Sequence, residues 1–218
     1  MNSKHSFWQA LIVAIIIFWT GIMLGILFEN SRTSKLENFY KSSETQIFDI
    51  QLTGNLLMNE ANPDCNTALQ DNIDFADRIY EEAKTLEKYD ASNKITDDIV
   101  KLHSRYDLLR TMLWLNVIGL QEKCSNQTNI VVYLYQYVEP NIDTQAKQVA
   151  ISKVTSDLKK KYGDKVLLIP LAYDTGVKSL SLLRSKYQIN EFPVVIVNQK
   201  NKITGLNTVE ELEKYLEL

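Results

Sequence analysis

An uncharged apolar run near the amino terminus constrains the fold more than any other feature. Residues 7–28 contain no charged side chain, and Gln9 and Thr20 are their polar interruptions. A helix needs about 20 such residues to cross the ~30 Å hydrocarbon core of a bilayer. We therefore predict a transmembrane helix over residues 7–28, preceded by a short tail of residues 1–6.

The alternatives to an anchor are a buried globular helix and a cleaved signal peptide. The apolar core of a signal peptide is about 7 to 15 residues long and leads to a small-x-small cleavage site. This run is longer, and it ends in Leu27-Phe28-Glu29-Asn30. An uncleaved anchor is favoured.

The orientation of the anchor is not decided by the flanking charges. Lys4 stands on one side, and Arg32 and Lys35 stand on the other. The sequon that begins at Asn126 and two cysteines without metal-ligand spacing favour an oxidising compartment for the rest of the chain. We predict a single-pass cell-membrane protein with a cytoplasmic amino terminus and an extracytoplasmic carboxy-terminal part.

A GxxxG pair lies inside the apolar run. Gly21 and Gly25 have the spacing that lets two membrane helices approach closely, although glycine is common in such helices anyway. A dimer through these two residues is a hypothesis.

Residues 35–124 show helical periodicity in three stretches, which predicts a helical segment outside the membrane. A turn at residues 90–93 makes the second and third helices an antiparallel hairpin. The expected apolar stripes are Leu36, Tyr40, Ile47, Ile50 and Leu57, with Phe39 and Phe48 beside them; then Leu69, Ile73, Ala76, Ile79, Ala83 and Leu86; then Ile95, Ile99, Leu102, Tyr106, Leu109, Leu113, Val117 and Leu120.

The two cysteines of the chain fall at the open end of this hairpin. Cys65 begins the second helix and Cys124 follows the third, so the two helices bring them within roughly 10 Å at 1.5 Å rise per residue. We predict a structural Cys65–Cys124 disulfide. The alternative is a redox-active pair. Such pairs usually have a CxxC motif or a cysteine at a helix amino terminus, and only Cys65 comes near such a position.

Composition argues against several functions. The formal net charge of -3 gives no basic field for nucleic acid. His103 is expected at the surface or partly packed, and the other histidine, His5, lies before the anchor. We predict no metal site, no cofactor and no catalytic constellation.

After Cys124 the pattern becomes an alternation of strands and helices. We predict strands at 130–135, 165–171, 194–197 and 203–204, and a turn at 200–202. A helix opening at Pro140 and closing at Gly163 is expected to bury Ile142, Ala146, Val149, Leu158 and Tyr162, a second helix covers 180–187, and Asn207 and Thr208 cap a last helix that reaches Leu218.

This order of elements resembles the thioredoxin fold over residues 129–218. The most specific match is Tyr187-Gln188-Ile189 followed by Phe192-Pro193-Val194, with Asp174 and Gly205 in fitting positions. The resemblance implies an α/β domain with a central mixed sheet flanked by helices, and a cis peptide before Pro193. The whole part beyond the anchor also resembles uncharacterised membrane-anchored thioredoxin-like proteins of archaea.

The matching segment lacks the chemistry of that family. Members carry a CxxC after the first strand, whereas residues 136–143 contain no cysteine and no serine. The resemblance still implies a peptide-binding groove beside the cis-proline. The alternative is that the residues there only cover the edge of the sheet. The expected members of the groove are Tyr137, Glu139, Pro140, Asn141, Phe192 and Pro193.

Three functions remain open from the sequence. The leading one is a redox-inactive module for extracytoplasmic protein binding, scaffolding or chaperone-like work. The second is a noncanonical thiol-disulfide oxidoreductase that uses Cys65 and Cys124. The third is an inactive subunit that partners a cysteine-bearing paralogue.

Overall fold

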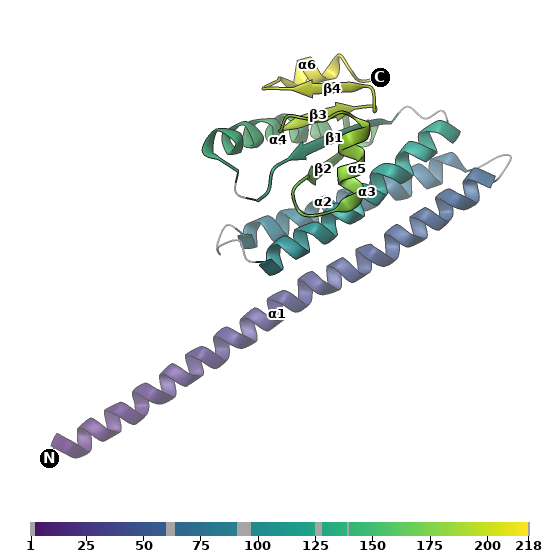
Figure 1. Cartoon of the computed structure of the whole chain (residues 1–218). Coiled ribbons are helices and arrows are strands. Elements are labelled where there is room, and N and C mark those ends of the chain that lie inside the picture. The colour runs from purple at the N-terminus through teal and green to yellow at the C-terminus, as the bar shows by residue number, and fades with distance from the viewer. Residues whose placement is uncertain (1–2, 60–63, 91–96, 125–127, 139, 218) are drawn as a thin grey trace. The chain divides into compact units, whose positions relative to one another are not determined.

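A computed structural model describes residues 3–59, 64–90, 97–124, 128–138 and 140–217. The chain divides into two compact units, Met1–Lys41 and Ser42–Leu218. Helix α1 spans Ser3–Asn59, so it forms the first unit and enters the second. The chain is mostly helical, with one small mixed sheet (Figure 1).

The first unit contains one helix long and apolar enough to cross a membrane. Its span, Phe7–Phe28, has a mean hydropathy of 2.8 and is not buried by the rest of the chain. The hydroxyl of Thr20 donates to the carbonyls of Ile16 and Ile17, at 3.0 and 2.9 Å. This polar group is thereby satisfied within the helix, as an apolar environment requires. A Cβ added at Gly21 or Gly25 would meet no atom within 4 Å, and the dimer hypothesis stays untested.

Three helices make the helical part of the second unit. The end of α1 packs against α2 (Cys65–Asp90) and α3 (Asp97–Cys124). Ile47 and Ile50 are buried as predicted, whereas Phe48 is exposed. A Cβ on Gly54 would lie 2.6 Å from the Asn116 Oδ1 atom, so glycine is what lets α1 approach α3 here.

The predicted stripes of α2 and α3 are largely confirmed. The buried residues among them are Ile73, Ala76, Ile79, Ala83, Tyr106, Leu109, Leu113, Val117 and Leu120. Phe75 and Trp114, which the pattern did not single out, are also fully buried. The turn expected at residues 90–93 lies almost wholly outside the described residues.

The predicted disulfide is present. Cys65 and Cys124 are bonded, with a sequence separation of 59 residues and Cα atoms 5.7 Å apart. Cys124 packs on Ala68 and Leu120, so the bond joins the first turn of α2 to the last turn of α3. The sequon at Asn126 lies outside the described residues.

Four strands form the sheet, in the order β2-β1-β3-β4. They are β1 (Asn129–Tyr135), β2 (Val166–Ala172), β3 (Val194–Val197) and β4 (Asn201–Thr204). β1 pairs in parallel with β2, and antiparallel with β3, which in turn pairs antiparallel with β4. The two central strands are buried on both faces, as their continuous apolar sequences indicate.

Helices cover both faces of this sheet (Figure 1). Val131, Tyr133 and Val195 form one apolar cluster with residues of α4 (Ile142–Tyr162) and α6 (Val209–Glu213). On the other face, α3 packs against β2 and against α5 (Lys178–Lys186). The rings of Trp114 and Tyr187 stack there with centroids 5.3 Å apart. The helical hairpin is therefore one layer of the second unit.

The predicted inner face of α4 is right at Leu158 and Tyr162, which pack in the core, and wrong in the first half of the helix. Ile142 is 87% exposed and Val149 is 67% exposed, and Ala146 is also exposed. The buried side chains are Gln148, Ile151, Thr155 and Leu158. The error arises because Gln148 and Thr155 are polar residues that make hydrogen bonds in the interior. A search for periodic apolar residues does not select polar positions as buried.

Some predicted boundaries also change. The hairpin turn covers residues 198–200, not 200–202, because Asn198 and Gln199 adopt positive φ angles of 50° and 60°. Thr208 forms the predicted capping box with Glu211, but α6 ends at Glu213, short of Leu218. Asn207 does not cap this helix; its amide donates to the Gly205 carbonyl at 3.0 Å.

Replacing both Cys65 and Cys124 by serine is expected to destabilise the protein. Opening a loop of 59 residues removes about 4 kcal/mol of unfolding free energy in the chain-entropy model, and lowers the melting midpoint by about 10 °C. Thermal unfolding of the full chain in detergent measures this. Dithiothreitol should lower the wild type to the midpoint of the double variant and leave the variant unchanged. Equal midpoints for all samples would contradict a structural role.

Candidate functional site

The loop that follows β1 is held in place by two side chains. The carboxylate of Asp174 accepts hydrogen bonds from the backbone N–H groups of Tyr137 and Val138, at 2.8 and 2.9 Å. The side chain of Gln148 accepts from the Gln136 N–H at 2.7 Å and donates to the Gln136 carbonyl at 2.9 Å. These hydrogen bonds hold the backbone of the loop at the position where the resemblance would place a pair of cysteines.

Helix α3 contributes a histidine against this loop. His103 is buried, with 3% of its surface exposed, and its ring stacks on Tyr137 with centroids 3.8 Å apart. The expectation of a surface or partly packed histidine is wrong. Its imidazole is buried because α3 lies against the sheet, and a tyrosine ring covers it.

One turn further along α3, Asp107 is buried completely. Its carboxylate accepts a hydrogen bond from the Ala172 N–H at 3.1 Å and one from the Thr175 hydroxyl at 2.8 Å. Arg110 Nη1 lies 3.7 Å from the Asp107 Oδ1 atom, and the Arg110 side chain is 4% exposed. This cluster joins α3 to the end of β2.

Burial raises the pKa of the Asp107 carboxyl above its usual value. The guanidinium of Arg110 and the hydrogen bonds from Thr175 and Ala172 oppose that shift. A buried ion pair of this kind depends on every partner, because removing one leaves the other charge without compensation in a medium of low polarity.

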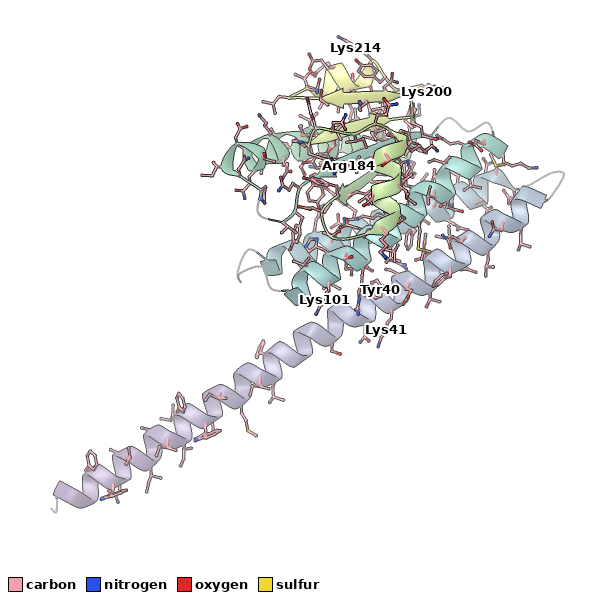
Figure 2. The ribbon with its side chains drawn as sticks, viewed as in Figure 1. Tyr40, Lys41, Lys101, Arg184, Lys200 and Lys214 are labelled. Atoms are coloured by element: carbon pink, nitrogen blue, oxygen red, sulfur yellow. A yellow bond between two sulfur atoms is a disulfide. The ribbon has the colours of Figure 1, made fainter. Side chains whose placement is uncertain are left out.

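An aromatic surface lies beside Pro193. The rings of Tyr173 and Phe192 stack with centroids 3.5 Å apart. The guanidinium of Arg184 lies 5.2 Å from the Phe192 ring centroid and 5.6 Å from that of Tyr173, and its Nε donates to the Ile189 carbonyl at 3.0 Å. Arg184 stands on α5, as labelled in Figure 2. Pro193 itself is buried, and the Phe192–Pro193 peptide is cis.

The predicted groove residues make different contacts within the described chain. Tyr137 stacks on His103, while Phe192 stacks on Tyr173, a residue without a distinctive signal in the sequence. Asn141 caps α4 by accepting from the Thr144 N–H at 2.8 Å. Pro140 is half-buried, and Glu139 lies outside the described residues. A single groove that joins Tyr137 to Phe192 stays a prediction.

The described residues offer few reactive groups. Both cysteines of the chain are in the disulfide. Within the described ranges, no cluster of three histidine, cysteine or carboxylate side chains has a metal-binding arrangement. For binding, the site provides aromatic rings, the guanidinium of Arg184 and backbone hydrogen-bonding groups.

A sequence signal for the buried cluster did exist. His103, Asp107 and Arg110 recur at steps of four and three, which places them on one side of a helix whose remaining faces are rich in apolar residues. A polar stripe in such a helix predicts a buried polar contact. The partners Ala172 and Thr175 carry no comparable signal, because their contact is long-range.

No protein-family model and no curated protein matches the chain. One solved structure, titled "Structure of a malarial protein", aligns with 41% of this chain and 99% of its own, at 20% identity and a TM-score of 0.31. A TM-score of this size does not establish a shared fold.

Asp107→Ala is expected to lower the free energy of unfolding by about 3–5 kcal/mol, because it leaves Arg110 buried without its counter-ion. The Ala172 N–H and the Thr175 hydroxyl lose an acceptor as well. Chemical denaturation of the full chain in detergent, followed by near-ultraviolet circular dichroism, measures the loss. The matched control is Asp71→Ala on the exposed side of α2, which should change stability by less than about 0.5 kcal/mol. Similar losses for both variants would contradict the role given to Asp107.

Proposed function

We propose that this chain is a single-pass membrane protein whose α/β part is a redox-inactive thioredoxin-like domain that binds an extended protein segment outside the cytoplasm. The fold assignment is supported by the order β1-α4-β2-α5-β3-β4-α6, which is the order that the resemblance implies. A parallel β1–β2 pair beside an antiparallel β3–β4 hairpin fits it too.

One observation carries the binding proposal. Residues 190–192 form no backbone–backbone hydrogen bond with any described residue, and β3 begins only at Val194. Asn190 and Glu191 are exposed, and they border a hollow of about 250 Å³. Unpaired backbone in an accessible segment is what an incoming extended chain needs for strand addition.

The neighbouring side chains suit a protein ligand. Tyr173, Phe192 and Arg184 lie next to the unpaired backbone, and aromatic and arginine side chains supply much of the binding energy at protein interfaces. The backbone would supply affinity without sequence selectivity, and the rings would select an apolar or aromatic side chain of the bound segment. A scaffold or chaperone-like protein needs this combination.

The oxidoreductase alternative is less well supported. The disulfide holds the ends of two helices, and the carboxylate of Asp64 lies directly before Cys65. Hydrogen bonds from Thr67 lower the pKa of Asp64, so that a negative charge stands beside the Cys65 position. That charge opposes thiolate formation, whereas the position of Cys65 at the start of α2 favours it, so the environment of Cys65 gives no clear activation.

Site-specific photocrosslinking tests the binding proposal. A benzophenone amino acid at Asn190 of the full chain, in its native membrane, is expected to give a restricted set of protein adducts. Tyr173→Ala and Phe192→Ala should each reduce these adducts about tenfold, because each removes a ring from the binding surface.

The matched control is the same probe at Lys214, an exposed residue after α6. Equal adduct patterns at positions 190 and 214, or adducts unaffected by both ring truncations, would contradict the proposal. Thiol-dependent reduction of insulin that is lost in Cys65→Ser, with the fold retained, would instead establish the oxidoreductase alternative.

The orientation of the anchor is tested by thiol labelling in intact cells. The natural cysteines are bonded, so a cysteine introduced at Ser181, an exposed residue on α5, is the sole target of an impermeant maleimide. We expect Ser181→Cys to be labelled from outside and Ser3→Cys only after permeabilisation. The reverse pattern would show that the carboxy-terminal part is cytoplasmic. Release of the protein by alkaline carbonate would contradict an anchor.

A further inference from the structure

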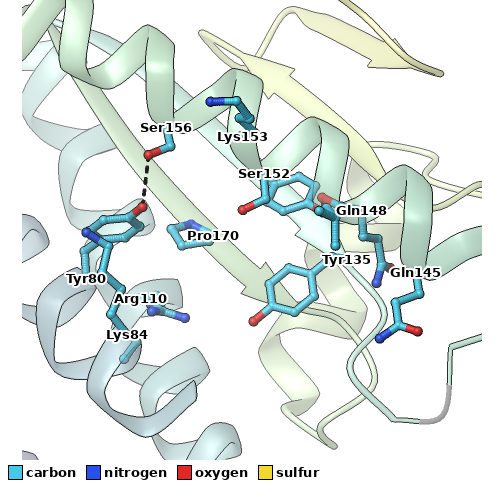
Figure 3. A pocket seen from close by; sticks show the side chains of 13 residues that line it. Tyr80, Lys84, Arg110, Tyr135, Gln145, Gln148, Ser152, Lys153, Ser156 and Pro170 are labelled. Carbon is cyan, nitrogen blue, oxygen red and sulfur yellow. Dashed lines mark hydrogen bonds between the residues drawn. The ribbon is translucent and has the colours of Figure 1, made fainter. Parts of the chain in front are cut away.

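A second candidate site is a cavity of about 450 Å³ over the edge strand β2 (Figure 3). Side chains of α2 and α3 stand on one side of it, among them Lys84 and Arg110. Tyr135 of β1 and Gln145 of α4 stand on the other side, with Pro170 between. The volume lies in the range of about 300–1,000 Å³ that is typical of small-molecule sites.

The lining of this cavity is positively charged. It includes Arg110, Lys84 and Lys153, and none of its 13 residues is acidic, in a chain whose net charge is -3. Lys84 and Lys153 pair with Glu81 and Asp157, at 2.7 and 3.1 Å, but neither carboxylate lines the cavity. Three cations and no acid therefore line the cavity itself.

Arg110 has unused hydrogen-bonding capacity. Its side chain is 4% exposed, and its Nε is buried without a hydrogen-bond partner among the described residues. Its contact with Asp107 runs through Nη1, over 3.7 Å, and Asp107 does not line the cavity. A buried guanidinium N–H without an acceptor is costly and rare in native proteins, and it indicates a group that the protein alone does not provide.

We propose that this cavity binds a small organic acid with an aromatic or other apolar body. The carboxylate accepts hydrogen bonds from Arg110, whose planar fork matches its geometry. The apolar body lies between Tyr135 and Pro170, which line the same cavity. The inference uses other residues than the proposed peptide surface and does not depend on it.

Fluorine NMR of 4-fluorophenylacetate with the full chain in nanodiscs tests the proposal. We expect the line of this acid to broaden, with a dissociation constant that is roughly millimolar for a ligand of this size. The neutral analogue 4-fluorophenylacetamide should bind at least about tenfold more weakly, because it lacks the charge that Arg110 recognises. Equal broadening of the two compounds would overturn the proposal.

Variants place the binding in the cavity. Val149 lines the cavity and is 67% exposed, so Val149→Trp should fill the opening without disturbing the core and abolish binding. Ala150→Trp, at an exposed position of the same helix that does not line the cavity, should leave binding unchanged. Arg110→Lys keeps the charge beside Asp107 but loses the planar fork, and should weaken binding about tenfold. Full binding by Val149→Trp would overturn the assignment, even if Arg110→Lys failed to fold.

Competition identifies the part of the ligand that is recognised. Inorganic phosphate that displaced the acid at equal concentration would show that the apolar body contributes nothing, which would overturn the proposed ligand class. A tripeptide ending in phenylalanine that competes only with a free terminal carboxylate would support the proposal and identify the acid as a chain end. Failure of this peptide, with 4-fluorophenylacetate bound, would support a free small acid.

Discussion

The buried carboxylate of Asp107 is the interaction on which the second unit depends. Through this carboxylate, helix α3 accepts hydrogen bonds from groups at the end of β2. The N–H of Ala172, the last residue of β2, has Asp107 as its acceptor, and so has the hydroxyl of Thr175 in the following loop. One buried carboxylate therefore both pairs with a charge and accepts a backbone hydrogen bond. Polar contacts as well as apolar ones hold α3 to the sheet.

That contact also determines where another chain can add to the sheet. β2 is an edge strand, and unpaired edges invite strand addition. The N–H of Ala172 donates to Asp107, Pro170 has no N–H group, and the N–H of Val166 donates to the Gly163 carbonyl. The β2 edge is poorly suited to an incoming strand, and the space above it is a lined cavity. The backbone before Pro193 has no such protection, which favours it as the place for an extended segment.

The sequence predicted the elements well and their polar contacts poorly. The apolar run, the two long helices, the disulfide and the third strand all follow from local periodicity or spacing, and all are present. The inner face of α4 could not be predicted by counting apolar residues, because Gln148 faces inward to bind the backbone of Gln136, twelve residues away. Asp107 and Thr175 are 68 residues apart, and no local pattern joins them. Local rules find what a segment buries, but the pairing of buried polar groups depends on the tertiary fold.

The loop after β1 carries no thiol and is held by contacts from two directions. Its backbone N–H groups at Tyr137 and Val138 are bound by Asp174, and the ring of Tyr137 is covered by His103 from α3. A side chain introduced at this loop would lie beside a helix that packs against it. The protein segment proposed above would instead make contact on the side of Tyr173, Phe192 and Arg184, where two rings and a cation lie beside unpaired backbone. The disulfide at the far end of the hairpin holds α2 and α3 together, and in this way it maintains the layer that covers the loop.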